Sequence, residues 1–185
     1  YEAFSESLSW AIHGVYMARR ALYDRYPYDD SCRAYSDDNT TRLHYYISRE
    51  VRPCGGRYYY RQHEASVTHK AGLRHFDYLR ANESMRRQLI DLGVGDDVLR
   101  RYENQRWLVL VDCWRFYFIH RQRMTPHDRR AARGEMKRVW KTIDTTTLEP
   151  HNKWKLGYMP LRPSWRLFCL QEELYFTLKR WLRRL

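Results

Sequence analysis

The sequence has no long uninterrupted apolar run, and this absence limits what the chain can be. Its most apolar stretch, 107–119, is interrupted by Asp112 and Arg115. It is also shorter than the roughly 20 residues that cross a bilayer, so it predicts a buried helix. The first residues carry Glu2 and Glu6 and lack an apolar segment, which argues against a secretory signal at this point.

Cysteine is scarce and never paired at short spacing. The four cysteines are Cys32, Cys54, Cys113 and Cys169. The absence of a CxxC pair argues against a zinc ribbon or a redox dithiol. The pattern is typical of reduced thiols in a cytosolic protein.

Lysine is absent from the first 69 residues, where nine arginines balance nine acids. The formal net charge of +12 therefore belongs entirely to residues 70–185. Such a field attracts phosphate groups, anionic lipid or nucleic acid, and it does not choose among them. With 30% charged and 43% hydrophobic residues, the composition is that of a soluble, folded protein.

The first 70 residues show both strand and helix patterns. We expect strands over 10–17 and 57–62, a short helix over 18–26, and a helix from Asp37 or Asp38 to about Arg49. Residues 71–185 show helical patterns throughout. Gly93 should end one helix, the next should run from Asp96 or Asp97 to Arg123, and Thr125-Pro126 should start another.

The last predicted helix follows Ser164, and it has three interpretations. Its apolar stripe consists of Leu167, Leu170, Leu174, Leu178, Trp181 and Leu185. An amphipathic helix packed on its neighbours, with solvated arginines, is the simpler interpretation. The alternative is a helix that lies in the headgroup region of an anionic membrane. Nucleic-acid binding is a third possibility, but no RNA- or DNA-binding motif supports it.

Two adjacent carboxylates, Asp37 and Asp38, open the predicted helix of the first part. Acids at a helix start cap free N–H groups and complement the helix dipole, which is their ordinary role. The same dipole keeps a carboxylate ionised, as a general base requires. With two aspartates, capping and catalysis are compatible.

The segment Tyr58-Tyr59-Tyr60-Arg61-Gln62-His63 places Arg61 and His63 on the same side of the second predicted strand. The tyrosines are typical of sheet packing. His63, His69 and His75 recur every six residues, an interval that suits neither one helical face nor a zinc-protease motif.

Together, residues 10–22, Tyr35-Ser-Asp-Asp-Asn-Thr-Thr41 and the segment 57–68 resemble the carboxyl half of bacterial family-2 glycosyltransferases of the GT-A fold. Asp37 stands where that family usually has Glu, and Asp38 where it has Asp. The resemblance covers about residues 9–70, and 71–185 looks like the variable helical tail of that family. The nucleotide-binding strands and the metal-binding DxD of the family have no counterpart here.

This resemblance implies an α+β, mostly helical fold: residues 1–70 as the strand-containing acceptor side of a GT-A domain, and 71–185 as a helical bundle. It implies Asp38 as the base that takes a proton from an acceptor hydroxyl, with Asp37 as its support. Arg61 and His63 would bind the leaving diphosphate, or His63 a metal. A divalent metal, Mg²⁺ or Mn²⁺, is implied for the full-length enzyme.

The leading hypothesis is therefore part of an inverting glycosyltransferase that moves a sugar from a nucleotide-sugar donor to a cell-surface polysaccharide or lipid-linked glycan. We expect the chain to be a piece of a longer protein and to be inactive alone. The alternative is a non-catalytic binding module whose residues 164–185 dock on an anionic membrane or a partner protein, with no nucleic acid expected. Either protein would be cytoplasmic, at the inner face of the cell membrane.

Overall fold

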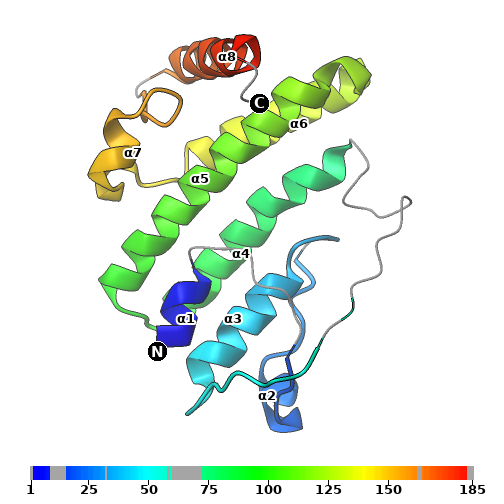
Figure 1. Cartoon of the computed structure of the whole chain (residues 1–185), viewed down its shortest axis with the longest axis vertical. Helices are drawn as coiled ribbons and strands as arrows, with labels where there is room; N and C mark the ends of the chain where they lie inside the picture. Colours follow the sequence, from blue (N-terminus) through cyan, green and yellow to red (C-terminus); the bar gives the residue numbers. More distant parts are fainter. Residues whose placement is uncertain are drawn as a thin grey trace.

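The computed structural model describes residues 2–8, 16–31, 33–57, 59, 72–161 and 164–182. These residues form helices joined by irregular segments, and no strand occurs among them. Figure 1 shows helices α4, α6 and α8 arranged around the long helix α5 (Asp96–His120). The expected α+β fold is therefore wrong, because the part of the chain that can be described is all-helical.

The bounds of the other helices follow the chain. They are α1 (Glu2–Ser7), α2 (Arg20–Arg25), α3 (Asp37–Ile47), α4 (Asp77–Asp91), α6 (Pro126–Trp140), α7 (Pro150–Trp154) and α8 (Trp165–Trp181). Short 3₁₀ turns precede α4 (Leu73–Phe76), follow α5 (Arg121–Arg123) and precede α7 (Thr145–Thr147).

The two expected strands are where the fold differs from the sequence prediction. Tyr16 and Met17 have no regular secondary structure, and residues 51–57 are irregular and exposed. The remainder of both segments lies mostly outside the described residues. A strand is stable only beside another strand. In the described first part, the apolar residues instead pack between helices, as Leu43 of α3 does against α1 and α4.

Helix α5 is the centre of the larger hydrophobic core. Its side chains Trp107, Leu110 and Trp114 are completely buried, and the helix contacts α4, α6 and α8. Because neighbours surround it, its middle turns are apolar on nearly all sides. The prediction of a buried helix over 107–119 is confirmed.

A second core joins the two parts of the chain. Phe4 of α1 and Leu43 of α3 pack in the same cluster as Met85 and Leu89 of α4 and Tyr102 of α5. Residues on both sides of position 70 thus share one buried apolar cluster.

The predicted start of α6 and the predicted end of α4 are confirmed. The Thr125 hydroxyl accepts a hydrogen bond from the Asp128 backbone N–H at 3.1 Å, and Pro126 occupies the first turn of α6. Gly93 ends α4 with φ of 64°, and the Gly93 N–H donates to the carbonyl of Ile90 at 2.9 Å. Glycine adopts this left-handed conformation without steric cost.

Candidate functional site

The two aspartates of the predicted catalytic pair lie in the first turn of α3 but face different surroundings. Asp37 is exposed, whereas Asp38 is buried. The Asp38 carboxylate lies 3.9 Å from the guanidinium of Arg42, one turn later. Arg42 is also buried, and its Nε donates to the carbonyl of Ser7 at 2.8 Å. Asp38 is therefore inside the protein beside Arg42, and Arg42 in turn connects α3 to α1.

The other predicted site residues, Arg61 and His63, lie outside the described residues. Among the residues that the structure describes, no group of three or more His, Cys, Asp or Glu is placed to hold a metal ion.

Helix α3 buries several polar side chains, which the helix-start pattern did not predict. The amide of Asn39 donates to the Asp29 carboxylate at 2.7 Å and to the carbonyl of Ala81 at 2.8 Å. Thr40 accepts a hydrogen bond from the Asp29 backbone at 2.9 Å. These bonds join the irregular segment before α3 to α3 and α4, and they give partners to the Asn39 amide nitrogen and the Thr40 hydroxyl, whereas Asn39 Oδ1 has none among the described residues.

The side of α8 that faces solvent carries a continuous row of large apolar side chains. We call this row the leucine stripe: Leu167, Leu170, Leu174, Leu178 and Trp181. Their exposed fractions are 50%, 56%, 55%, 49% and 80%. Residues three or four positions apart share one helical face. The predicted apolar stripe therefore exists and faces solvent, while α8 itself packs on α5 with Arg166 and Arg180 exposed, as the simpler interpretation predicts.

The opposite side of α8 holds the helix on the protein. Phe168 and Phe176 are buried. The ring centroid of Phe168 lies 5.5 Å from that of Trp107 and 5.9 Å from that of Trp114. The ring of Phe176 lies 5.9 Å from that of Phe118. These contacts bury one face of α8 against α5 while the leucine stripe remains outside.

Basic side chains border the leucine stripe. Arg166 and Arg180 are exposed and by helical periodicity lie along one edge of it. Lys179 lies instead on the side of α8 that faces α5, with Nζ 5.0 Å from the ring centroid of Tyr175. The acid at this surface, Glu173, forms an ion pair with Arg121. The border of the stripe therefore carries excess positive charge.

Glu172, the other acid of α8, is fully buried. Burial raises its pKa to about 8, because desolvation disfavours the ionised carboxylate. Its Oε1 accepts a hydrogen bond from Gln171 at 3.2 Å, whereas Oε2 has no partner among the described residues. At neutral pH Glu172 is mostly protonated and does not offset the positive charge of α8.

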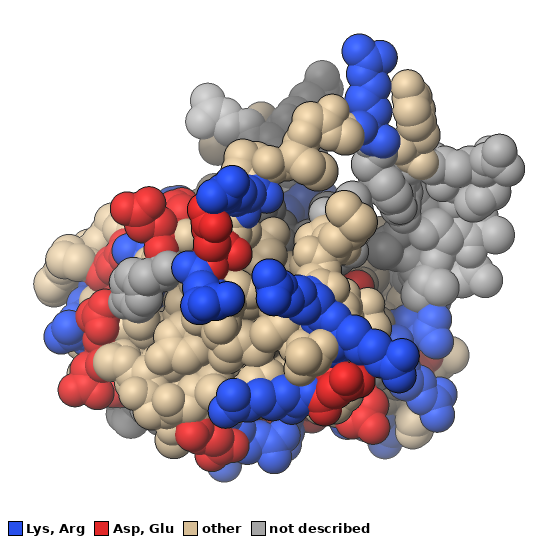
Figure 2. Space-filling view, turned by 90° about the horizontal axis from the view of Figure 1, so that it is seen from below, with Lys and Arg blue, Asp and Glu red and all other residues tan. Residues whose placement is uncertain are grey.

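The end of the molecule opposite α8 has a different character. Figure 2 views that end from below and shows acidic and basic side chains interspersed with uncharged ones. Opposite charges so mixed give no field of a single sign. The combination of an apolar stripe with a basic edge is thus a property of the α8 surface and not of this end.

In the described part of the chain, the fold is all-helical, and α8 is an amphipathic helix whose apolar stripe is exposed. None of the helices in the described residues combines the length and the apolar character needed to cross a membrane. Comparisons of the chain with protein-family models, with curated proteins and with solved structures find no match.

The glycosyltransferase hypothesis stays a prediction. A GT-A domain is built on a sheet, and the described residues contain none. Its proposed base, Asp38, is buried beside Arg42, whereas a general base must reach the hydroxyl that it deprotonates. The arrangement of α3 supports a structural role for Asp38, and the surface of α8 is the stronger candidate for function.

Proposed function

We propose that this protein is a membrane-binding module whose helix α8 lies in the headgroup region of an anionic membrane. The exposed leucine stripe carries the proposal. Helices that lie in the membrane interface have leucine and tryptophan on one face and lysine or arginine beside it, as α8 does. Because the opposite face of α8 stays packed on α5, the folded protein can bind without rearrangement.

The basic residues of α8 favour a bilayer, and not a second copy of the chain, as the partner that covers the leucine stripe. Two α8 helices paired antiparallel about Leu174 would place Arg166 of each close to Arg180 of the other. Like charges brought together at an interface oppose association. An anionic bilayer has the opposite sign and attracts the basic edge of the stripe.

The sequence of residues 164–185 contains five basic residues, Arg166, Lys179, Arg180, Arg183 and Arg184, against two acids. Each basic residue near an anionic surface contributes about 1 kcal/mol. The cytoplasmic leaflet of cell membranes is the anionic one. We therefore place the action of this protein at the cytoplasmic face, as a peripheral protein.

Co-sedimentation with vesicles tests this proposal. The chain should sediment with vesicles of equal parts phosphatidylcholine and phosphatidylglycerol, and much less with phosphatidylcholine alone. Binding should weaken as salt is raised, because salt screens the attraction between exposed charges. The double variant Leu170→Ser/Leu174→Ser should bind about tenfold less, since two leucines no longer enter the interface.

Ile90→Ser/Ile119→Ser is the matched control for that variant. Both isoleucines are 45% exposed, close to the leucines in exposure, and neither lies on α8. Thermal melts should show that both double variants fold. Equal loss of binding in the two variants, or no binding to anionic vesicles at low salt, would refute membrane docking.

Sedimentation velocity of the lipid-free protein tests the competing occupant. A monomer is expected. If the chain is a dimer and Leu170→Ser/Leu174→Ser makes it monomeric, the leucine stripe is a protein interface and the membrane proposal is wrong.

A further inference from the structure

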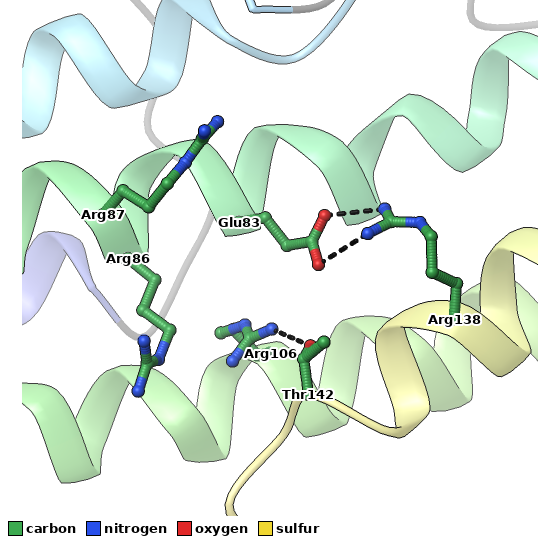
Figure 3. A pocket seen from close by; sticks show the side chains of 6 residues that line it. All are labelled: Glu83, Arg86, Arg87, Arg106, Arg138 and Thr142. Carbon is green, nitrogen blue, oxygen red and sulfur yellow. Dashed lines mark hydrogen bonds and ion pairs between the residues drawn. The ribbon is translucent and has the colours of Figure 1, made fainter.

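A cavity of about 320 Å³ lies between α4, α5 and α6, on a part of the molecule that does not include α8. It falls at the small end of the range of ligand pockets, which begins at about 300 Å³. Its lining residues, drawn in Figure 3, are Glu83, Arg86, Arg87, Arg106, Arg138 and Thr142. Four guanidinium groups from three helices thus line one small cavity.

Positive charge exceeds negative charge in and around this cavity. The acids that pair with its arginines are Glu83, Glu103 and Glu135. Arg80, which pairs with Glu135, also belongs to the network. Five arginines therefore face three glutamates, which leaves an excess of two positive charges around the cavity. Such an excess attracts an anion.

Two of the arginines are held in fixed positions. Arg138 donates to both carboxylate oxygens of Glu83, at 2.9 and 2.6 Å. Arg106 lies across the floor of the cavity in Figure 3 and donates to the Thr142 hydroxyl at 2.7 Å. Its NH1 also donates to both oxygens of Glu103, each at 2.9 Å. Because these groups are already ordered, an incoming anion loses little entropy in ordering them.

One arginine of the cavity lining is free to bind an anion. It is not Arg106, whose side chain is 1% exposed and whose Nε, unpaired among the described residues, is buried away from the open part of the cavity. Arg87 is exposed, and the described residues offer it no ion pair. It can therefore turn to an anion without breaking an existing bond.

We propose that this cavity binds a phosphate group, with Arg87 as a donor to its oxygens and Arg106 and Arg138 as fixed positive charges beside it. Guanidinium groups form short, charge-assisted bonds with phosphate oxygens. A phosphate monoester carries close to two negative charges at neutral pH, which matches the excess in the cavity. A carboxylate would neutralise only half of it. The proposal is independent of membrane docking by α8.

A phosphate monoester can come from a dissolved molecule or from the headgroup of phosphatidic acid. Isothermal titration calorimetry of the full chain with inorganic phosphate tests the first source. Chloride keeps the ionic strength constant during the titration. Titration with vesicles of phosphatidylcholine and phosphatidic acid tests the second, and phosphatidylglycerol vesicles of equal charge show how much binding is due to α8.

Arg87→Gln is the decisive variant, because Arg87 has no structural partner among the described residues and its loss should not affect folding. The substitution should raise the dissociation constant for inorganic phosphate about tenfold, the loss expected for one charged hydrogen bond. Arg130→Gln removes the same charge from an exposed arginine of α6 that does not line the cavity. This control should leave phosphate binding unchanged.

Three outcomes decide the matter. Saturable binding of inorganic phosphate that Arg87→Gln weakens and Arg130→Gln does not supports a site for dissolved phosphate. Binding that appears only with phosphatidic acid vesicles, with the same dependence on Arg87, supports the lipid headgroup. No saturable binding of either probe, or equal losses in the two variants, overturns the proposal.

Discussion

Arg106 and Glu103 form a buried salt bridge within α5, in which NH1 of the arginine donates to both oxygens of the carboxylate, each at 2.9 Å. Glu103 also pairs with Arg86 of α4 and accepts a hydrogen bond from the Asp144 backbone at 3.2 Å. One carboxylate therefore links α4, α5 and the segment that follows α6. These buried charged groups fix the positions of α4, α5 and the segment after α6 relative to one another more strictly than apolar packing alone would.

The substitution Glu103→Ala should lower the free energy of unfolding by about 3–5 kcal/mol, because it leaves Arg106 buried without a countercharge. Urea unfolding followed by tryptophan fluorescence measures this loss. Glu149→Ala, at an exposed position, should change the free energy by less than about 0.5 kcal/mol. Similar values for the two variants would show that the bridge does not hold the core together.

The buried carboxyl of Glu172 should make stability depend on pH. Its pKa is about 8 in the folded protein and near 4.3 when the chain is unfolded. The folded state thus retains the proton to higher pH. The stability linked to Glu172 is fully present below the unfolded pKa and is lost as pH rises to about 8. The free energy of unfolding should therefore decline between pH 5 and pH 8.

The variant Glu172→Gln should flatten this decline, which reaches at most about 1.4 kcal/mol per pH unit for one group. Urea unfolding at several pH values measures the slope. The neighbouring substitution Glu173→Gln removes a carboxylate that is only partly buried and should retain the wild-type slope. An unchanged slope in Glu172→Gln would mean that another group titrates.

Gly157 and Gly134 should respond oppositely to alanine. Gly157 has φ of 81°, and an added Cβ would lie 2.3 Å from Cδ1 of Tyr175. Gly157→Ala should therefore destabilise the protein by about 1–3 kcal/mol. Gly134 lies within α6 with open space around it, so Gly134→Ala should stabilise by about 0.5–1 kcal/mol. Thermal denaturation of both variants gives the two signs, and a loss of stability in Gly134→Ala would contradict this account.

Asp38 and Asp37 should differ in their effect on folding. Asp38→Asn removes the countercharge of buried Arg42 and should lower the free energy of unfolding by about 1–3 kcal/mol. Asp37→Asn alters an exposed side chain and should have an effect below about 0.5 kcal/mol. Chemical denaturation of both variants measures the difference. Equal, small effects would remove the structural role assigned to Asp38.

Several helix boundaries could be predicted because their signals are local. Thr125 and Pro126 start α6, and Gly93 ends α4, through bonds to residues only a few positions away. The burial of α5 followed from apolar residues on nearly all its sides. Such features depend on the chain close to the residue itself.

Features that depend on distant residues could not be predicted in the same way. Aromatic and polar alternation favoured strands, but a strand also needs a partner, which the described residues do not supply. The arginine-lined cavity combines side chains from three helices, and no spacing in the sequence signals it. Asp38 was recognised as a helix-start residue, whereas its burial beside Arg42 depends on how α1 packs on α3.

The sequence by itself determined where α4 ends and where α6 begins, and that α8 has an apolar stripe. Only the tertiary structure decided which side of α8 is buried. Besides the leucine stripe, α8 carries Phe168 and Phe176 on its other side, so periodicity alone allowed either face to pack. Rings on α5, among them Trp107 and Trp114, pack against Phe168. That packing leaves the leucines outside, where a membrane can bind them.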